Sequence, residues 1–342
     1  MDLLKARSRF MRYKYFLFLA GAVLAALYGP ALVCYDRPVV GSAVIDKDKG
    51  KDKKKKERNR ELDPALIPSR IFQGGIFEAS GVAFAPGSDS VFFVDDNRAN
   101  EVLWMRLDQD GNQVGEIKPV SLGVNVEDPE GITFDGSWFY VVGSQSELKG
   151  EEPNSLVRFR FDSETQSVKD VESVGGLYQF LTDGVSELKE YAGKKGKKET
   201  INIEGLAWDP VQERILLGLR DPEISEQALI VPLKLRNPSA PLSRENLILA
   251  QPNAIRLSLG GATIRSIEYD SSLNLFEIIA GSPESKKKME FKLWQWDGQT
   301  PPREKAALGA KLKPEGVARV SIGGNDFIFI VCDVGEYLKL DD

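Results

Sequence analysis

The chain of 342 residues contains 42% hydrophobic and 28% charged residues, which is typical of a globular protein large enough to bury a sizeable core. It contains no histidine, which excludes Ser-His-Asp and Cys-His catalysis, a histidine general base and histidine-containing zinc sites. Residues 61–342 carry 30 basic and 45 acidic side chains, a net charge of −15, and this charge disfavours a nucleic-acid partner.

The chain begins with an apolar segment behind a basic leader. The leader "MDLLKARSRFMRYK" contains five Lys or Arg, and residues 15–33 contain no charged side chain. Residues 1–33 are therefore predicted to be a signal peptide or a membrane anchor, and the apolar length, near the ~20 residues that span a bilayer, leaves both open. Because the closest basic residues precede the segment, we expect the rest of the chain on the periplasmic or extracytoplasmic side; the alternative is a domain anchored at the cytoplasmic face.

Residues 34–63 are predicted to be a basic, disordered tether. Residues 47–60, "KDKGKDKKKKERNR", hold nine basic and three acidic side chains and no apolar one, so they cannot pack against a core. Two interpretations stand for them: attraction to anionic lipid headgroups beside the apolar segment, or a solvated spacer. The predicted membrane partner is thus reached through residues 15–33 and, in the first interpretation, through residues 47–60 as well.

Residues 64–342 contain one short pattern five times, at intervals of 50, 74, 61 and 50 residues. Each copy is followed by a continuous apolar run, such as "ILLGLRDP" at 215, and then by an alternating run, such as "EVLWMRLD" at 101. Repeats of about 40 to 50 residues with three or four strands each are typical of a β-propeller. The five copies are "SGVAFAP" at 80–86, "EGITFDG" at 130–136, "EGLAWDP" at 204–210, "RSIEYDS" at 265–271 and "EGVARVS" at 315–321.

The two ends of the repeat region predict how the ring closes. The last copy stops after its third strand, whereas "ALIPSRIFQGGIF" at 65–77 lies before the first copy. We therefore expect the N-terminal segment to supply the outer strand of the last blade, in an all-β propeller of five blades.

The 74-residue interval leaves a six-bladed ring as the alternative. Its extra residues include "YQFLTDGVSELKEYAGKKGKKE" at 178–199, which predicts one amphipathic helical insertion ending near Gly193 rather than a sixth blade. The residues at helical spacing are Phe180, Leu181, Val185, Leu188 and Tyr191.

The repeat openings "DPEGITFDG", "EGLAWDP", "IRSIEYD" and "KPEGVA" resemble those of a bacterial β-propeller family of unknown function, which is distantly similar to the esterase-like phytase propellers. The resemblance covers most of residues 71–338. It implies the propeller fold, and it implies no established activity.

One mouth of the propeller channel is the predicted functional site. The first strand of each blade lines the channel and the second returns antiparallel, so the starts of first strands and the ends of second strands meet on one face. The candidates at the starts of first strands are Glu130, Glu204, Glu315 and Arg265, with Ser80 at the equivalent position. The candidates at the ends of second strands are Asp95, Asp96, Arg220, Asp221 and Asp333.

The three glutamates allow two interpretations. Ca²⁺ prefers oxygen ligands, so Glu130, Glu204 and Glu315 are a functional cluster that either binds such an ion or tunes the pKa values of its members for acid-base work. Alternatively, each glutamate accepts backbone N–H bonds or pairs with Arg220 or Arg265 and fixes the geometry of the blades.

Three functions fit this sequence. The first is an exported or membrane-tethered propeller that binds a ligand or a protein through its acidic channel mouth. The others are a cation-dependent phosphoesterase, esterase or lactonase, and a structural envelope protein. We favour binding because the sequence shows no recognisable catalytic constellation and a fold alone does not determine activity; whether the protein is an enzyme stays open.

Overall fold

The structure is a computed structural model, and it describes residues 68–146, 154–193, 200–283 and 290–341. The predictions for residues 1–33 and for the tether, including the membrane segment and the lipid-binding residues 47–60, lie outside the described residues. No helix within the described ranges is long and apolar enough to cross a membrane.

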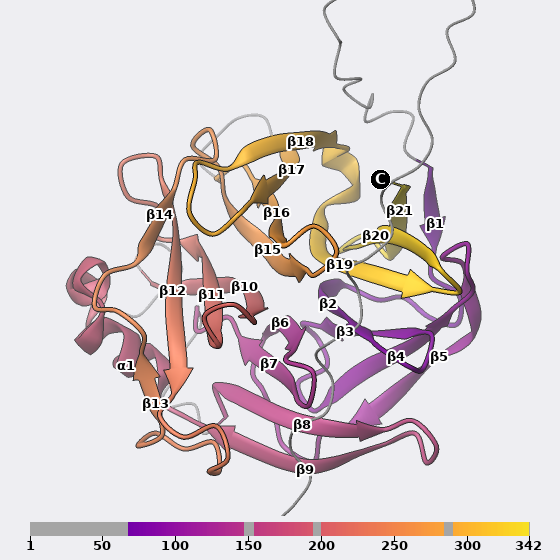
Figure 1. The fold of residues 1–342 in the computed structure, drawn as a ribbon, viewed down its shortest axis with the longest axis horizontal. Coiled ribbons are helices and arrows are strands. Elements are labelled where there is room, and N and C mark those ends of the chain that lie inside the picture. The colour runs from indigo at the N-terminus through magenta and orange to yellow at the C-terminus, as the bar shows by residue number, and fades with distance from the viewer. Residues whose placement is uncertain (1–67, 147–153, 194–199, 284–289, 342) are drawn as a thin grey trace, which may run out of the picture. The chain divides into compact units, whose positions relative to one another are not determined.

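The described strands form five antiparallel sheets arranged as blades around a common axis (Figure 1). The prediction of an all-β, five-bladed propeller is confirmed, and the six-bladed alternative is wrong. Blade 1 contains β2 (Ala79–Ala85), β3 (Ser90–Asp95), β4 (Glu101–Leu107) and β5 (Gln113–Ser121). Blade 2 contains β6 (Pro129–Phe134), β7 (Phe139–Gly143), β8 (Leu156–Asp162) and β9 (Ser167–Val174).

The other three blades follow the same order from the axis outward. Blade 3 contains β10 (Asn202–Asp209), β11 (Arg214–Asp221) and β12 (Ala228–Leu235), whose outer edge is shared by β13 (Leu247–Leu249) and β14 (Ile255–Leu257). Blade 4 contains β15 (Thr263–Asp270), β16 (Leu275–Gly281), β17 (Phe291–Trp296) and β18 (Arg303–Leu308). Blade 5 contains β19 (Pro314–Ile322), β20 (Asn325–Cys332), β21 (Glu336–Asp341) and β1 (Ser69–Ile71), and a short 3-10 helix, η3 (Ala310–Leu312), precedes it.

The N-terminal strand closes the ring as the sequence predicts. β1 pairs antiparallel with β21, with Ser69 opposite Leu338 and Ile71 opposite Glu336. The two ends of the propeller are therefore held in one sheet, which gives β21 a neighbour on its outer edge.

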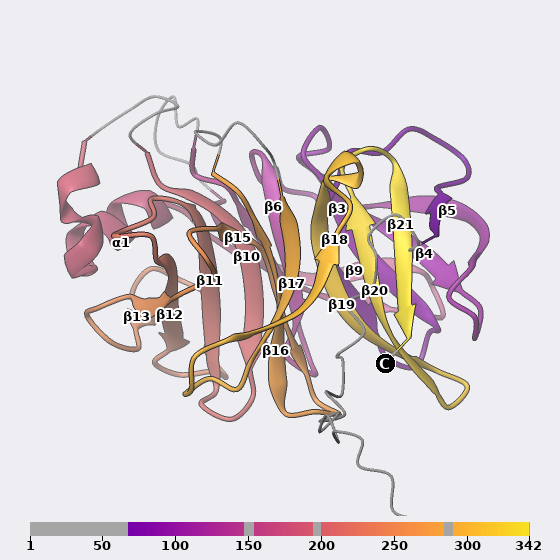
Figure 2. The same cartoon turned by 90° about the horizontal axis from the view of Figure 1, so that it is seen from above.

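The continuous apolar second strands are explained by the contacts between blades. Each of the five hydrophobic clusters fills one interface between neighbouring blades. On β3, Phe92 packs toward blade 2 and the next residue, Phe93, packs toward blade 5. Successive side chains of a strand point to opposite faces, so a strand buried on both faces loses the polar half of its pattern. Figure 2 shows the blades standing edge-on side by side.

In three blades an aspartate ends the first strand or directly follows it, and it shapes the turn. Asp209 accepts hydrogen bonds from the backbone N–H groups of Val211 and Gln212, each at 3.1 Å. Asp135 and Asp270 hold the equivalent turns of blades 2 and 4. The repeated Asp of "FDG", "WDP" and "YDS" is therefore a turn residue.

The glycine of the repeated Glu-Gly pair lies where first strands of neighbouring blades touch. A Cβ atom on Gly316 would lie 2.3 Å from the carbonyl oxygen of Ser80 in blade 1, and one on Gly131 would lie 2.6 Å from Cβ of Leu206 in blade 3. The same close approach recurs at Gly81 and Gly205. A residue without a side chain is needed at these places, which explains the recurrence of the glycine.

The substitution Gly316→Ala is therefore expected to destabilise the folded protein by about 2–3 kcal/mol in urea unfolding, because the new methyl group meets backbone that cannot move aside. Ser266→Ala is the matched control, since blade 4 already carries a side chain at this position. The Ser266 hydroxyl accepts a hydrogen bond from Val317 N at 3.1 Å, and its loss is expected to cost about 1 kcal/mol. Equal costs for the two variants would contradict this account of the glycine.

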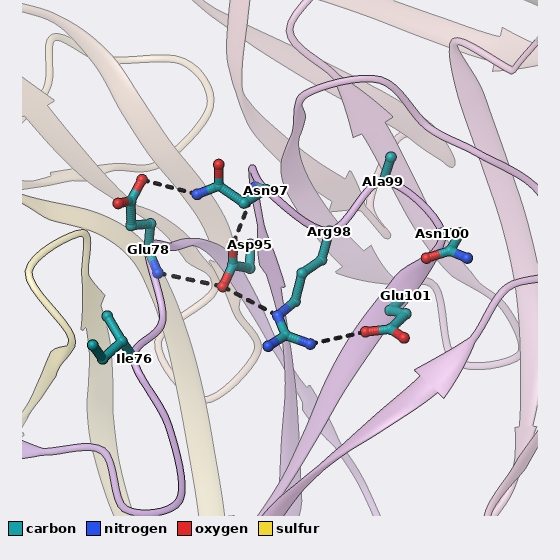
Figure 3. A pocket seen from close by; sticks show the side chains of 8 residues that line it. All are labelled: Ile76, Glu78, Asp95, Asn97, Arg98, Ala99, Asn100 and Glu101. Carbon is teal, nitrogen blue, oxygen red and sulfur yellow. Dashed lines mark hydrogen bonds and ion pairs between the residues drawn. The ribbon is translucent and has the colours of Figure 1, made fainter.

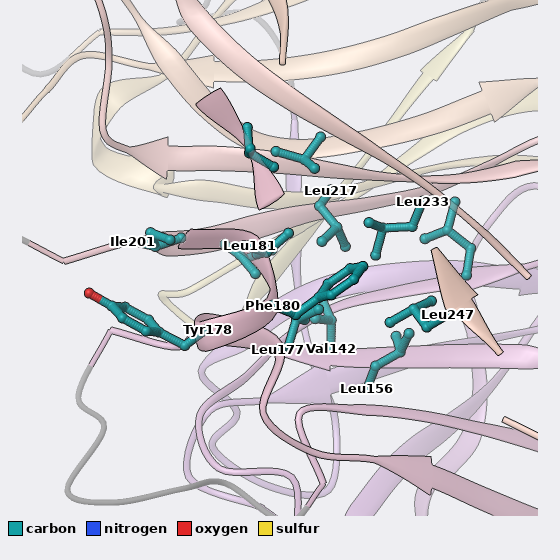
Figure 4. Packing of buried hydrophobic residues seen from close by; sticks show 14 of the residues in the cluster. Val142, Leu156, Leu177, Tyr178, Phe180, Leu181, Ile201, Leu217, Leu233 and Leu247 are labelled. Carbon is teal, nitrogen blue, oxygen red and sulfur yellow. The ribbon is translucent and has the colours of Figure 1, made fainter. Parts of the chain in front are cut away.

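The predicted helical insertion lies between blades 2 and 3, and it consists of two short helices. α1 spans Leu177–Gly184 and the 3-10 helix η2 spans Ser186–Tyr191. Figure 4 shows Leu177 beside Val142 of blade 2, and Phe180 and Leu181 among the apolar side chains that fill the space between blades 2 and 3. The insertion thus adds apolar cover to blade 3 and forms no sixth blade.

The prediction of a single helix that ends near Gly193 is wrong, because the backbone is extended at Val185, with φ −90° and ψ 123°. Contacts with blade 3 account for the break. A Cβ atom on Gly184 would lie 2.5 Å from Cδ1 of Leu249, and Ser186 N donates to the carbonyl oxygen of Pro252 at 3.0 Å. Helical spacing continues through this point in the sequence, but tertiary contacts redirect the backbone.

Candidate functional site

Each first strand carries a β-bulge at the position that opens the repeat. In blade 2, Pro129 pairs with Gly143 and Gly131 pairs with Val142, which leaves Glu130 unmatched on β7. The equivalent irregularity occurs in the other blades at Ser80–Gly81, Glu204, Arg265 and Glu315. A bulge turns a side chain away from the regular alternation of the strand. We call Ser80, Glu130, Glu204, Arg265 and Glu315 the axial cluster, and the propeller face on which they lie the top face.

Glu204 is the best-paired member of the axial cluster. Its Oε1 lies 2.6 Å from Nη1 of Arg220, and its Oε2 lies 3.1 Å from Nη1 of Arg265. The side chains of Glu204 and Arg265 are each 3% exposed. Asn202 Nδ2 adds a longer hydrogen bond of 3.3 Å to Oε1. The arginine-paired interpretation therefore describes the contacts of Glu204, which bridges a guanidinium of its own blade and one of blade 4.

Glu315 forms a longer ion pair with Arg265 than Glu204 does. Its Oε1 lies 3.6 Å from Nη1 of Arg265, farther than the Glu204 carboxylate. Burial raises the pKa of Glu315 from an ordinary 4.5 to about 8; Arg265 opposes the rise and the charge of Glu204 adds to it. The Glu315 carboxyl is therefore mostly protonated at neutral pH.

Glu130 has the least compensated carboxyl group of the cluster. Burial raises its pKa well above the ordinary 4.5, and the charges of Glu204, Asp128 and Glu315 raise it further. The side chain of Ser80 hydrogen-bonds to Glu130 and offsets only part of this rise. Within the described residues no Lys or Arg forms an ion pair with Glu130. A buried carboxyl without a neighbouring cation is stabilised in its protonated form, so the surroundings of Glu130 favour the neutral acid over the carboxylate.

A second set of carboxylates surrounds the axial cluster on the top face. Burial raises the pKa of Asp96 to about 6, and the charges of Glu78, Asp95, Asp128 and Asp333 add to the rise. Asp128 accepts a hydrogen bond from the Ser144 hydroxyl, and Asp333 pairs with Lys313 at 2.5 Å. The acidic residues near the axis thus influence one another across blades 1, 2 and 5, and their combined potential is negative.

The structure places Asp95 and Asp221 on the top face as predicted, opposite Ala79 and Asn202, but their surroundings differ from those of the axial cluster. Asp95 is buried at the end of β3, where it accepts hydrogen bonds from the N–H groups of Glu78 and Asn97 and lies 3.6 Å from Nε of Arg98. It therefore serves as a turn residue. Asp221 is exposed at the end of β11, whereas the members of the axial cluster are buried or half-buried.

Several polar residues of the top face were not predicted as site residues, although a pattern in the sequence indicates them. The residue two positions before each bulge residue is polar in all five blades, and it lies at or just before the start of the first strand. Extending the alignment of the repeats by two residues would have found them. They are Glu78, Asp128, Asn202, Thr263 and Lys313.

No group of three or more Asp, Glu, His or Cys in the described ranges is placed to hold a metal ion. The calcium site predicted at Glu130, Glu204 and Glu315 stays a prediction. The pairing of Glu204 with two arginines already supplies positive charge at the place where the ion was expected.

Farther along the axis, a hydrogen bond joins blades that are not neighbours in the ring. The hydroxyl of Thr133 in blade 2 donates to Oε2 of Glu268 in blade 4 at 3.2 Å. Trp208 N of blade 3 donates to the same hydroxyl at 3.1 Å. Burial raises the pKa of Glu268 well above its ordinary value. These contacts tie three blades together on the far side of the axial cluster.

Part of the chain is similar to a protein family of unknown function. A family model described as "Protein of unknown function (DUF3616)" matches residues 162–326. No curated protein matches the sequence. The similarity to the phytase propellers expected from the sequence stays a prediction.

Solved structures similar to this chain include the soluble aldose sugar dehydrogenase of Escherichia coli, with 13% identity and a TM-score of 0.45 over 80% of this chain and 99% of that chain. A glucose dehydrogenase-type oxidoreductase of Thermus thermophilus has 11% identity and a TM-score of 0.41 over the same shares. Hydrazine synthase of Kuenenia stuttgartiensis has 12% identity and a TM-score of 0.34 over 74% of this chain, which spans 61% of that chain.

Proposed function

We propose that this protein is a binding propeller that takes an organic cation, such as an amine or a basic side chain, at the axial cluster. The observation that carries the proposal is the excess of acidic over basic side chains around the axis. Arg220 and Arg265 are engaged by Glu204, and Lys313 is engaged by Asp333. Glu130 is left without a basic partner in the described part of the chain.

A bound cation would change the protonation of this cluster. Burial and neighbouring carboxylates raise the pKa values of Glu130 and Glu315, because ionising either group would bury negative charge that is not fully compensated. A positive group placed between them would favour their ionised forms, so that binding would release protons. The carboxyls would then accept hydrogen bonds from an ammonium or guanidinium group.

An organic cation is favoured over a metal ion by the spacing of the carboxyls. A bare divalent ion needs several oxygen atoms at about 2.3–2.6 Å. The described carboxyls form no such group of three, whereas an amine with several N–H donors reaches acceptors that lie farther apart. The hydrolase and envelope alternatives, the exported location and the membrane tether stay predictions.

Thermal unfolding of the full chain with added spermidine, and separately with CaCl₂ at equal ionic strength, tests this proposal. Spermidine is expected to raise the melting temperature, with a stabilisation of about 2.7 kcal/mol when its free concentration is about 100 times Kd. The shift should disappear in the Glu130→Gln, Glu315→Gln double variant. It should persist in Glu116→Gln, which changes an exposed residue of β5.

Two outcomes would overturn the proposal. A shift with calcium alone would favour the metal site predicted from the sequence. A spermidine shift that survives in the double variant would place the binding of cations elsewhere on this acidic protein.

A further inference from the structure

The rim of the top face between blades 5 and 1 combines exposed aliphatic side chains with carboxylates. Ile76 is 92% exposed and Val334 is 42% exposed. The residues that follow them in the chain, Phe77 and Gly335, lie close together: the Phe77 carbonyl oxygen is 3.6 Å from the position that a Cβ atom on Gly335 would occupy. The segment between β1 and β2 therefore lies against the turn between β20 and β21, and Figure 3 shows Ile76 beside the ribbon of blade 5.

A pocket of about 520 Å³ opens beside Ile76. Its charged lining is negative overall. Arg98 lies 3.6 Å from Asp95 and 3.0 Å from Glu101, so its charge is balanced within the pocket. The exposed carboxylate of Glu78 accepts a hydrogen bond from the Asn97 amide at 2.9 Å and has no ion-pair partner in the described chain. Figure 3 shows Glu78 and Ile76 side by side at the edge of the pocket.

The electrostatic potential at this rim selects a positively charged partner. Asp96 follows the buried Asp95, and burial together with the charges of Glu78, Asp95, Asp128 and Asp333 raises its pKa to about 6. An anionic lipid surface would be repelled by these carboxylates. A second copy of the chain docked through the same face would bring like charges together. A basic segment of another protein would be attracted by the same carboxylates, so neither form of repulsion applies to it.

We infer that the rim formed by Ile76, Glu78 and Val334 is a docking surface for a basic, aliphatic segment of a partner protein. One aliphatic side chain of the partner would cover Ile76 and Val334, which removes apolar surface from water. A neighbouring Lys or Arg would pair with Glu78. The surface lies on the same face as the axial cluster but contains none of its residues, and the inference does not depend on the ligand proposed there.

Selection of random 12-residue peptides displayed on phage against the full chain tests this inference. We expect selected peptides to be rich in Lys or Arg together with Ile, Leu or Val. Fluorescence polarisation of the best peptide should then show affinity weakened by about tenfold or more in the Ile76→Ser, Val334→Ser variant and by about threefold to tenfold in Glu78→Gln. Val211→Ser, at a residue 75% exposed in the turn after β10, should bind as the parent does.

The variants also separate this surface from the axial cluster. All four substitutions fall on exposed residues, so little effect on folding is expected, and thermal melting checks this. Peptides without a basic and aliphatic character would overturn the inference, as would unchanged binding in the Ile76→Ser, Val334→Ser variant. Binding that is lost in the Glu130→Gln, Glu315→Gln variant and kept in the rim variants would assign the peptide to the axial cluster instead.

Discussion

Glu204→Gln is expected to destabilise the folded protein by about 3 kcal/mol, because it removes the carboxylate that lies within hydrogen-bonding distance of two guanidinium groups. The Arg265 side chain is 3% exposed and lies 3.1 Å from Glu204, so water cannot solvate its charge when the carboxylate is removed. In glutamine an NH2 group replaces one of the two carboxylate oxygens, and this group cannot accept a hydrogen bond from the guanidinium that it faces. Urea unfolding at pH 7 measures the change.

Glu130→Gln is the matched control for this experiment. It makes the same chemical change at the same bulge position in blade 2, where burial and neighbouring carboxylates raise the pKa of the carboxyl and favour its neutral form. Its effect is therefore expected to be small, or stabilising above neutral pH. Similar losses for Glu204→Gln and Glu130→Gln would contradict the separation of the two glutamates into a paired and an uncompensated group.

Glu315→Gln is expected to remove a loss of stability that the parent suffers as the pH rises. The folded state binds the Glu315 proton with a pKa of about 8 and the unfolded state with a pKa near 4.5. The folded form therefore binds more protons between these values, so the contribution of Glu315 is fully present below about pH 4.5 and is lost as the pH approaches 8.

The measurement is the free energy of unfolding of parent and variant at a series of pH values from about 5 to 9. The difference between them should shift in favour of Glu315→Gln by up to about 1.4 kcal/mol per pH unit up to about pH 8, and then level off. Glu116→Gln, on the exposed edge of blade 1, should follow the parent throughout. A constant difference between parent and Glu315→Gln would show that Glu315 titrates normally in the folded protein.

The sequence by itself determined the architecture of the described region. A pattern repeated five times, with a segment before the first copy and a missing strand after the last, was enough to predict five blades and the closure of β21 by β1. This worked because each blade is a local unit whose strands follow one another along the chain. The strand order therefore needs no knowledge of distant contacts.

The sequence also placed the glutamates of the axial cluster at one position of the repeat, but it could not tell them apart. Glu130 and Glu204 open the same motif, "EG", followed by an apolar run. In the structure Glu204 meets Arg265 from blade 4 and Arg220 from its own blade, whereas Glu130 meets Ser80 from blade 1. Most of these partners come from a neighbouring blade, so the residues of the motif itself cannot predict which partner each glutamate meets.

The tertiary structure alone decided the charge state of the site, the break at Val185 and the exposure of Ile76. A carboxyl changes its pKa with burial and with charges a few ångströms away, and these distances are set by the packing of whole blades against one another. The helix likewise ends where blade 3 offers the Pro252 carbonyl, not where the apolar spacing stops. Local patterns determine which strands form, and the packing between blades determines what each side chain at the axis can bind.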